Sequence, residues 1–183
     1  MASAKELQEK GVKLFQQKDY EEAVATFHEA AEAYATEGQN DMVAEMKSNI
    51  GLVHRALGEN QKALDVMQEA LQVFVELDDA RRTAMALGNL GGVYVAMGDK
   101  EQAYQSYRQA ADLFQEIGER KLHGETLIAM ADLQVRDGKL GAGAATYEVG
   151  LSELDKLTAS QKVLKGLIGI RNKVIGGGQQ SES

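Results

Sequence analysis

The chain has 183 residues, of which 44% are apolar and 26% are charged, and its formal net charge is -8. This composition is that of a globular chain long enough for one domain with a core, and it excludes a disordered protein. The acidic balance argues against the clustered basic surface on which nucleic-acid binding depends. The absence of cysteine excludes a disulfide framework, a thiolate metal site and a cysteine nucleophile.

Proline and tryptophan are absent, and aromatic residues make up only 5% of the chain. Long helices packed through alanine, leucine and valine fit this composition better than a sheet does. The N-terminus lacks the apolar core of a signal peptide, and no apolar run approaches the roughly 18 residues of a membrane span. The sequence therefore predicts an all-α cytoplasmic protein that binds neither membranes nor nucleic acid.

A spacing of 40 residues relates like residues along the whole chain. Small residues, alanines, bulky core residues and turn residues each recur at this interval, which indicates an array of similar structural units. The columns are Gly11, Gly51, Gly91 and Ala131; Ala23, Ala63, Ala103 and Gly143; Phe27, Met67, Tyr107 and Tyr147; Ala30, Ala70, Ala110 and Gly150; and Lys18, Gly58, Gly98 and Gly138.

Within each repeat, apolar residues recur with helical spacing on both sides of a short turn, so each repeat predicts a helical hairpin. A further helix follows the fourth hairpin and covers the open end of the array, as terminal units of stacked repeats must. In chain order we expect helices over about 3–17, 20–36, 41–57, 60–77, 81–97, 100–117, 121–137, 140–156 and 159–175.

The pattern of small residue, turn glycine, alanine and aromatic resembles the tetratricopeptide repeat. The stretch NLGGVYVAMGDKEQAYQSYRQAADLFQEIGER is similar to the longer-helix repeats of spindle-orientation adaptors and of many bacterial members. The resemblance implies a right-handed α-solenoid of four hairpins with a C-terminal capping helix, in a single domain. The repeats cover about 4–43, 44–83, 84–123 and 124–158, the domain covers 1–175, and the polar, glycine-rich residues 176–183 are expected to be disordered.

In this family, first helices line a concave surface that binds a peptide or helix of a partner protein. The resemblance therefore implies a non-catalytic scaffold or adaptor with a protein partner, and the mixed groove residues favour an amphipathic ligand. Carried over position by position, the peptide-binding residues are Asn49, Asn89, Gly88, Gly92, Leu52, Arg55, Met85, Val95, Phe15, Ile128 and Arg136.

Two features of this set carry most of the expectation. Asn49 and Asn89 lie one repeat apart, and their amides can bond the main chain of an extended peptide without reading its sequence, or alternatively cap and bridge neighbouring helices. Gly88 and Gly92 lie one helical turn apart and leave a bare strip of backbone, where a ligand would come closest unless both glycines are neutral. The lysine and asparagine of a carboxylate clamp are replaced by Gln8 and Val12, which disfavours chaperone tails.

Nothing in the sequence indicates catalysis, a cofactor or a metal site. The three histidines lie in different hairpins, and His28-Glu29 does not extend to a zinc-binding HExxH spacing. Acidic pairs such as Asp78-Asp79 fall at helix starts, where they cap free amides. The alternative to peptide binding is a structural role, in which the array self-associates through its ends or outer face. We expect a monomer or a weak homo-oligomer.

Overall fold

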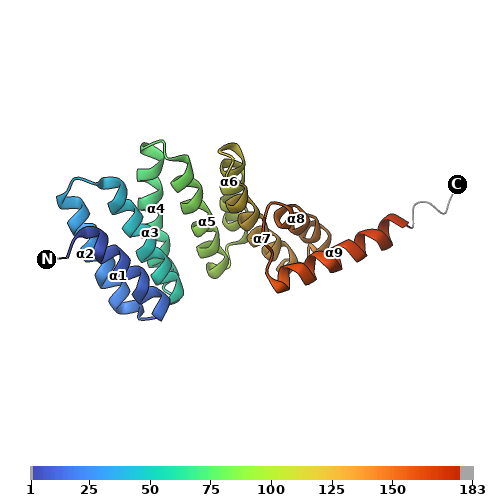
Figure 1. The fold of residues 1–183 in the computed structure, drawn as a ribbon, viewed down its shortest axis with the longest axis horizontal. Coiled ribbons are helices and arrows are strands. Elements are labelled where there is room, and N and C mark those ends of the chain that lie inside the picture. The colour runs from blue at the N-terminus through green and yellow to red at the C-terminus, as the bar shows by residue number, and fades with distance from the viewer. Residues whose placement is uncertain (1, 178–183) are drawn as a thin grey trace. The chain divides into compact units, whose positions relative to one another are not determined.

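A computed structural model describes residues 2–177, and all regular structure in this range is α-helical (Figure 1). Consecutive helices pair as hairpins joined by short turns, so the predicted all-α fold of four hairpins and a final helix is confirmed. The helices are α1 (Ala4–Gln17), α2 (Tyr20–Thr36), α3 (Asn40–Ala56), α4 (Asn60–Glu76), α5 (Ala80–Met97), α6 (Lys100–Glu116), α7 (Arg120–Arg136), α8 (Leu140–Ser152) and α9 (Ala159–Gly177).

The helices divide into two compact units. Unit 1 runs to Leu113 and contains α1 to α5 and most of α6. Unit 2 begins at Phe114 and contains α7, α8 and α9. In unit 1, α2 and α4 each pack both against the first helix of their own hairpin and against the first helix of the next one. The first helix α3 is thereby flanked by the second helices α2 and α4, which leaves its remaining face available as a surface.

The hairpin turns explain the column of turn residues. Lys18, Gly58, Gly98 and Gly138 all have positive φ, between 67° and 80°. This left-handed conformation ends a helix and satisfies its last carbonyl groups, and glycine adopts it without a steric penalty. At Gly98, the backbone N–H donates to the carbonyl groups of Tyr94 and Val95.

The column of small residues marks where the two helices of a hairpin approach one another most closely. A Cβ added to Gly91 would lie 2.7 Å from the ring of Tyr107, and one added to Gly11 would lie 2.6 Å from Phe27. Such contacts are shorter than real Cβ atoms make. The glycine column and the bulky column, 16 residues later, are therefore the two sides of one contact.

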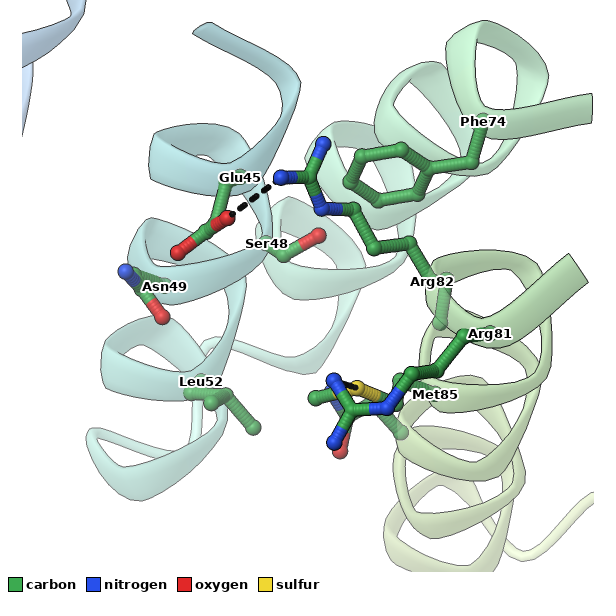
Figure 2. Close-up of a pocket in the computed structure, with 10 residues that line it drawn as sticks. Glu45, Ser48, Asn49, Leu52, Phe74, Arg81, Arg82 and Met85 are labelled. Atoms are coloured by element: carbon green, nitrogen blue, oxygen red, sulfur yellow. Dashed lines mark hydrogen bonds and ion pairs between the residues drawn. The ribbon is translucent and has the colours of Figure 1, made fainter. Parts of the chain in front are cut away.

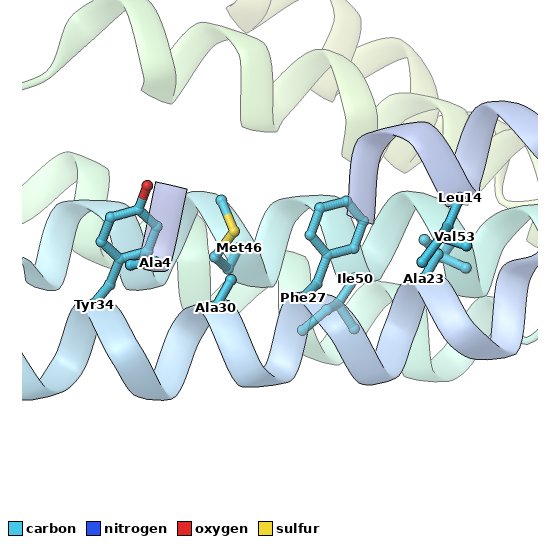
Figure 3. Packing of buried hydrophobic residues seen from close by; sticks show 9 residues of the cluster. All are labelled: Ala4, Leu14, Ala23, Phe27, Ala30, Tyr34, Met46, Ile50 and Val53. Atoms are coloured by element: carbon cyan, nitrogen blue, oxygen red, sulfur yellow. The ribbon is translucent and has the colours of Figure 1, made fainter. Parts of the chain in front are cut away.

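The core of unit 1 is a layer of apolar side chains between the helices (Figure 3). Phe27 of α2 lies between the first helices on either side of it, with Ile50 and Val53 of α3 fully buried nearby. The same arrangement recurs around Met67 in the next hairpin. The periodic sequence thus produces a periodic core.

The observed helix ends differ from the expected ones by at most two residues, except in α8. That helix ends at Ser152 rather than near residue 156. Its end lies tightly against α7, because a Cβ on Gly124 would be 2.7 Å from the carbonyl oxygen of Gly150. The next residue, Glu153, turns back to accept a hydrogen bond from Arg120 at 2.9 Å.

The final helix begins at a reciprocal cap. The backbone N–H of Thr158 donates to the Gln161 side chain, and the backbone N–H of Gln161 donates to the Thr158 hydroxyl. This pair of bonds is a capping box, and it fixes the start of α9 where the sequence predicted it. The helix continues to Gly177, two residues into the segment expected to be disordered, and residues 178–183 lie outside the described range.

Candidate peptide-binding groove

A pocket lies between α3 and α5, the first helices of the second and third hairpins (Figure 2). Its volume is about 180 Å³, below the roughly 300–1,000 Å³ of typical small-molecule sites. Leu52 of α3 and Met85 of α5 face one another across it. The lining residues are Glu45, Ser48, Asn49, Leu52, Phe74, Arg81, Arg82, Met85, Ala86 and Asn89.

Helical spacing brings these side chains to one surface. On α3 the lining positions are 45, 48, 49 and 52, and on α5 they are 81, 82, 85, 86 and 89. Residues three and four apart lie on the same face of a helix, so each helix contributes one continuous stripe. The repeat of 40 residues places the two stripes in register, which puts Asn49 and Asn89 at equivalent positions.

Arg82 links the two helices at one end of the pocket. Its guanidinium nitrogens lie 3.0 Å from Asp41, 3.5 Å from Glu45 and 3.6 Å from Asp79, and its charge lies 5.8 Å from the centre of the Phe74 ring. The hydrogen bond from Arg82 holds the pKa of the Asp41 carboxyl below its ordinary value. Three carboxylates thus surround this arginine, and its role is to hold α5 against α3.

The polar contacts continue from α3 to the first hairpin. Glu45 accepts a hydrogen bond from the Gln8 amide at 3.0 Å, and the Tyr34 hydroxyl donates to the Gln8 carbonyl oxygen at 2.6 Å. Burial, followed by the nearby Glu45 carboxylate, raises the pKa of Tyr34. The position that would hold a clamp lysine therefore holds a glutamine whose amide bonds two neighbours.

Several polar groups of the pocket have no partner in the described part of the chain. The side-chain amides of Asn49 and Asn89 make no hydrogen bond there, and the Ser48 hydroxyl is buried without one. Leu52 and the exposed Met85 supply apolar surface beside these groups. The pocket can therefore offer donors and acceptors to a main chain while covering an apolar side chain.

The predicted bare strip has a neighbour at both glycines, Ala110 of α6 at Gly88 and Arg55 at Gly92. A Cβ on Gly88 would meet only Ala110, at 3.9 Å. At Gly92 the guanidinium of Arg55 lies directly over the backbone, so that an added Cβ would collide with it. The guanidinium of Arg55 makes no ion pair or hydrogen bond with any other described residue. The Arg55 guanidinium therefore packs on the backbone of Gly92, in the space that a side chain at this position would occupy.

The remaining predicted residues do not line this pocket. Phe15 is partly buried, with its ring 5.8 Å from that of Tyr20. Val95 is partly buried near the end of α5. Ile128 and Arg136 belong to unit 2, where Ile128 lies against Gly150 of α8 and Arg136 is exposed.

The pocket also contains residues that the sequence analysis did not select. Arg81, Arg82 and Phe74 were missed, although Arg81 and Arg82 lie one turn before Met85 and could have been found by helical spacing. Phe74 belongs to a second helix, and no groove pattern includes it. The Phe74 side chain extends from α4 and reaches this surface between α3 and α5.

Other polar clusters are local. The ring nitrogen Nδ1 of His54 lies 2.6 Å from Glu59 across the hairpin turn, which explains why this histidine fits a helix-packing position. In unit 2, Tyr147 donates a hydrogen bond to Asp132. Among the described residues, no group of three potential ligands could hold a metal ion, and no described helix has the length and hydropathy of a bilayer span.

The comparisons with known proteins agree with this architecture. A family model described as "Tetratricopeptide repeat" matches residues 6–74 and 42–116. The crystal structure of BtubC (BKLC) from P. vanneervenii superposes with a TM-score of 0.77, covering 97% of this chain and 75% of that chain at 16% sequence identity. At that identity the likeness shows the fold alone. No curated protein matches the sequence.

Proposed function

Because this chain belongs to the tetratricopeptide repeat family, whose members generally mediate protein–protein interactions, we propose that it is a non-catalytic scaffold that binds a peptide or helix of a partner between α3 and α5. The observation that carries the proposal is the pair of unpartnered amides, Asn49 and Asn89, at equivalent positions of consecutive repeats. Side-chain amides are suited to bonding peptide groups because each offers both a donor and an acceptor.

The ligand that fits this pocket is amphipathic. Leu52 and Met85 would cover one apolar side chain of the partner, since the pocket has room for a side chain rather than for a whole small molecule. The two asparagines would bond the ligand's main chain on either side. Arg55, seated on Gly92, would extend the contact towards the end of α5.

The cytoplasm is the compartment that we propose for this role. Its net charge of -8 supports a protein partner rather than a nucleic acid. The self-associating alternative concerns a different surface of the molecule.

A displayed peptide library selected on the full chain tests the proposal. Selected peptides are measured by calorimetry against the parent and against the double variant Asn49→Ala and Asn89→Ala. Each of the two hydrogen bonds should contribute about 0.5–1.5 kcal/mol to the binding free energy. We therefore expect the double variant to bind at least about tenfold more weakly than the parent. The control is Gln105→Ala with Gln109→Ala, which removes two exposed amides one turn apart on α6.

Peptides that bind the asparagine variant as tightly as the parent would refute the groove assignment. Loss of binding in the glutamine control would place the ligand on the second helices instead. Circular dichroism of both variants shows whether a lost signal is a folding defect, which we do not expect because neither asparagine amide has a partner in the described fold.

A further inference from the structure

The helix α9 has two apolar faces, and only one of them is covered. Ile168 is buried against unit 2, as a core residue should be. Val163, Leu167 and Ile170 are 65%, 59% and 61% exposed, and their spacing of four and three residues aligns them in one stripe. Scattered apolar residues on a surface need no explanation, whereas three in line on one helix indicate a contact surface.

The charge of α9 is opposite to that of the rest of the chain. Residues 159–177 contain four basic residues and no acidic one, so the helix is +4 and the remaining residues together are -12, because the whole chain is -8. Two copies of α9 would repel one another, which excludes a symmetric pairing of this helix with itself. The surface that covers the stripe should therefore be both acidic and apolar.

Unit 1 carries such a surface at the turn between α4 and α5. Val75 and Leu77 are 55% and 52% exposed there, and the exposed acidic residues Glu76 and Asp78 alternate with them. We call these four residues the acidic turn. Leu77 also borders a hollow of about 290 Å³ between α3 and α4, which is lined by apolar and polar side chains and can receive a side chain from another molecule.

The backbone of the acidic turn is unusual among the repeats. Asp78 has a φ of 52°, whereas the equivalent positions one repeat before and after are Gly38 and Gly118, with φ of 73° and 75°. An aspartate at positive φ is less favourable than a glycine. This turn thus has a carboxylate at a position where the adjacent repeats have glycine, which adopts a positive φ more easily.

We propose that the exposed stripe of α9 in one molecule docks on the acidic turn of a second copy of this chain. The stripe would cover Val75 and Leu77, while the lysines beside it approach Glu76 and Asp78. The contact joins two different surfaces, so it repeats head to tail instead of closing as a symmetric dimer. Its small area places it among weak, transient interfaces. It leaves the pocket between α3 and α5 free and does not depend on peptide binding.

A second copy is favoured over a lipid surface by charge. An anionic bilayer would attract the basic residues of α9, but it would repel the -12 carried by the rest of the chain. A second copy instead brings that negative charge to the helix. The two readings differ in a measurable way, because docking on a second copy depends on protein concentration and requires no lipid.

Sedimentation velocity of the full chain tests the proposal, from about 5 to about 300 µM, where a small interface associates. At about 0.05 M salt the average mass should rise with concentration, and at about 0.5 M salt the protein should stay monomeric because the charges are screened. Leu167→Ser should weaken association about tenfold. Leu140→Ser is the matched control, since Leu140 lies on α8 in the same unit, is 65% exposed and is outside the stripe.

A charge exchange identifies the partner surface. One variant carries Lys162→Glu with Lys165→Glu, and the other carries Glu76→Lys with Asp78→Lys. Lysine is tolerated at positive φ in this chain, as Lys18 shows with a φ of 67°. Each variant alone should be monomeric, because like charges meet, and an equal mixture of the two should associate again.

Four results would overturn the proposal. The parent could be monomeric at every concentration at low salt. Association could persist in the Leu167→Ser variant or fall equally in the Leu140→Ser control, or the mixture of charge variants could stay monomeric. A monomeric parent that binds phosphatidylserine vesicles through Leu167 would assign the stripe to a lipid surface instead.

Discussion

The three glycines clustered in α5 predict opposite effects of the same substitution. Gly88→Ala adds a methyl group that meets only Ala110, at 3.9 Å, an ordinary van der Waals distance. Alanine is favoured over glycine in a helix interior by about 1 kcal/mol. We therefore expect Gly88→Ala to raise the free energy of unfolding of unit 1 by about that amount.

Gly91→Ala gains the same helix propensity but adds its methyl group 2.7 Å from two carbons of the Tyr107 ring and 3.0 Å from a third. The ring is buried, so the two helices of the hairpin must separate to make room. Overpacking of this kind costs about 1–3 kcal/mol. After the gain in propensity, the net effect is a loss of about 1 kcal/mol, and the two variants should differ by about 2 kcal/mol.

Gly92→Ala falls between these cases. The atoms it displaces are the flexible end of Arg55 rather than a packed ring, so Arg55 can swing away and the gain in propensity should largely remain. We expect the free energy of unfolding to rise by about 0.5 kcal/mol, and the contact between the Arg55 guanidinium and the backbone at position 92 to be lost.

Thermal unfolding followed by circular dichroism measures all three variants. For a unit of this size, 1 kcal/mol corresponds to about 4 °C in Tm, so Gly88→Ala should melt about 4 °C above the parent and Gly91→Ala about 4 °C below it. Urea unfolding supplies the free energies independently. A Gly91→Ala protein that is as stable as Gly88→Ala would refute the idea that the small column records close helix approach.

Three further predictions concern packing and charge. Arg82→Met should lower the free energy of unfolding at pH 7 by about 1–2 kcal/mol. Because Arg82 lowers the folded pKa of Asp41, that stabilisation is present above about pH 4 and should fade as the pH drops further. The urea midpoints of parent and variant should therefore converge in acid, and an equal difference at pH 7 and in acid would contradict the prediction. Burial and the hydrogen bond to Asp132 raise the pKa of Tyr147 to about 12. Phenolate absorbance should therefore show a late-titrating tyrosine in addition to Tyr34, whose pKa burial also raises. Asp132→Asn should move the titration of Tyr147 towards the ordinary value of about 10, and an unchanged titration would argue against the bond. Met67→Ala should lower the free energy of unfolding, measured in urea, by about 2–4 kcal/mol, because the buried Met67 side chain fills the space beside Gly51. A decrease below about 1 kcal/mol would mean that the helices close onto the cavity.

The repeat organisation could be predicted because its causes are local. The interval of 40 residues, the left-handed turn residues such as Gly98, and the cap at Asp79, whose carboxylate accepts from the backbone N–H of Arg82 at 2.9 Å, all act within a few residues of one another. Helix ends therefore followed from the sequence to within one or two residues at most positions. The end of α8 did not, because it depends on how closely α7 approaches Gly150.

The candidate site was predicted only in part, for a related reason. The groove positions that the family resemblance implied include Asn49, Asn89, Leu52 and Met85, and these four line one pocket. The resemblance could not show which charges are neutralised, because ion pairs join residues of different helices whose distances the sequence does not contain. Arg82, which the sequence analysis passed over, is surrounded by three carboxylates.

The sequence by itself determined that this chain is an array of helical hairpins, because periodicity and capping are properties of neighbouring residues. Tertiary structure decided what each side chain on those faces does. It seated Arg55 on Gly92 and left the stripe of α9 uncovered while burying Ile168. Those outcomes depend on the packing of one helix on another, and helices of similar pattern can be rotated against their neighbours without any change in local sequence.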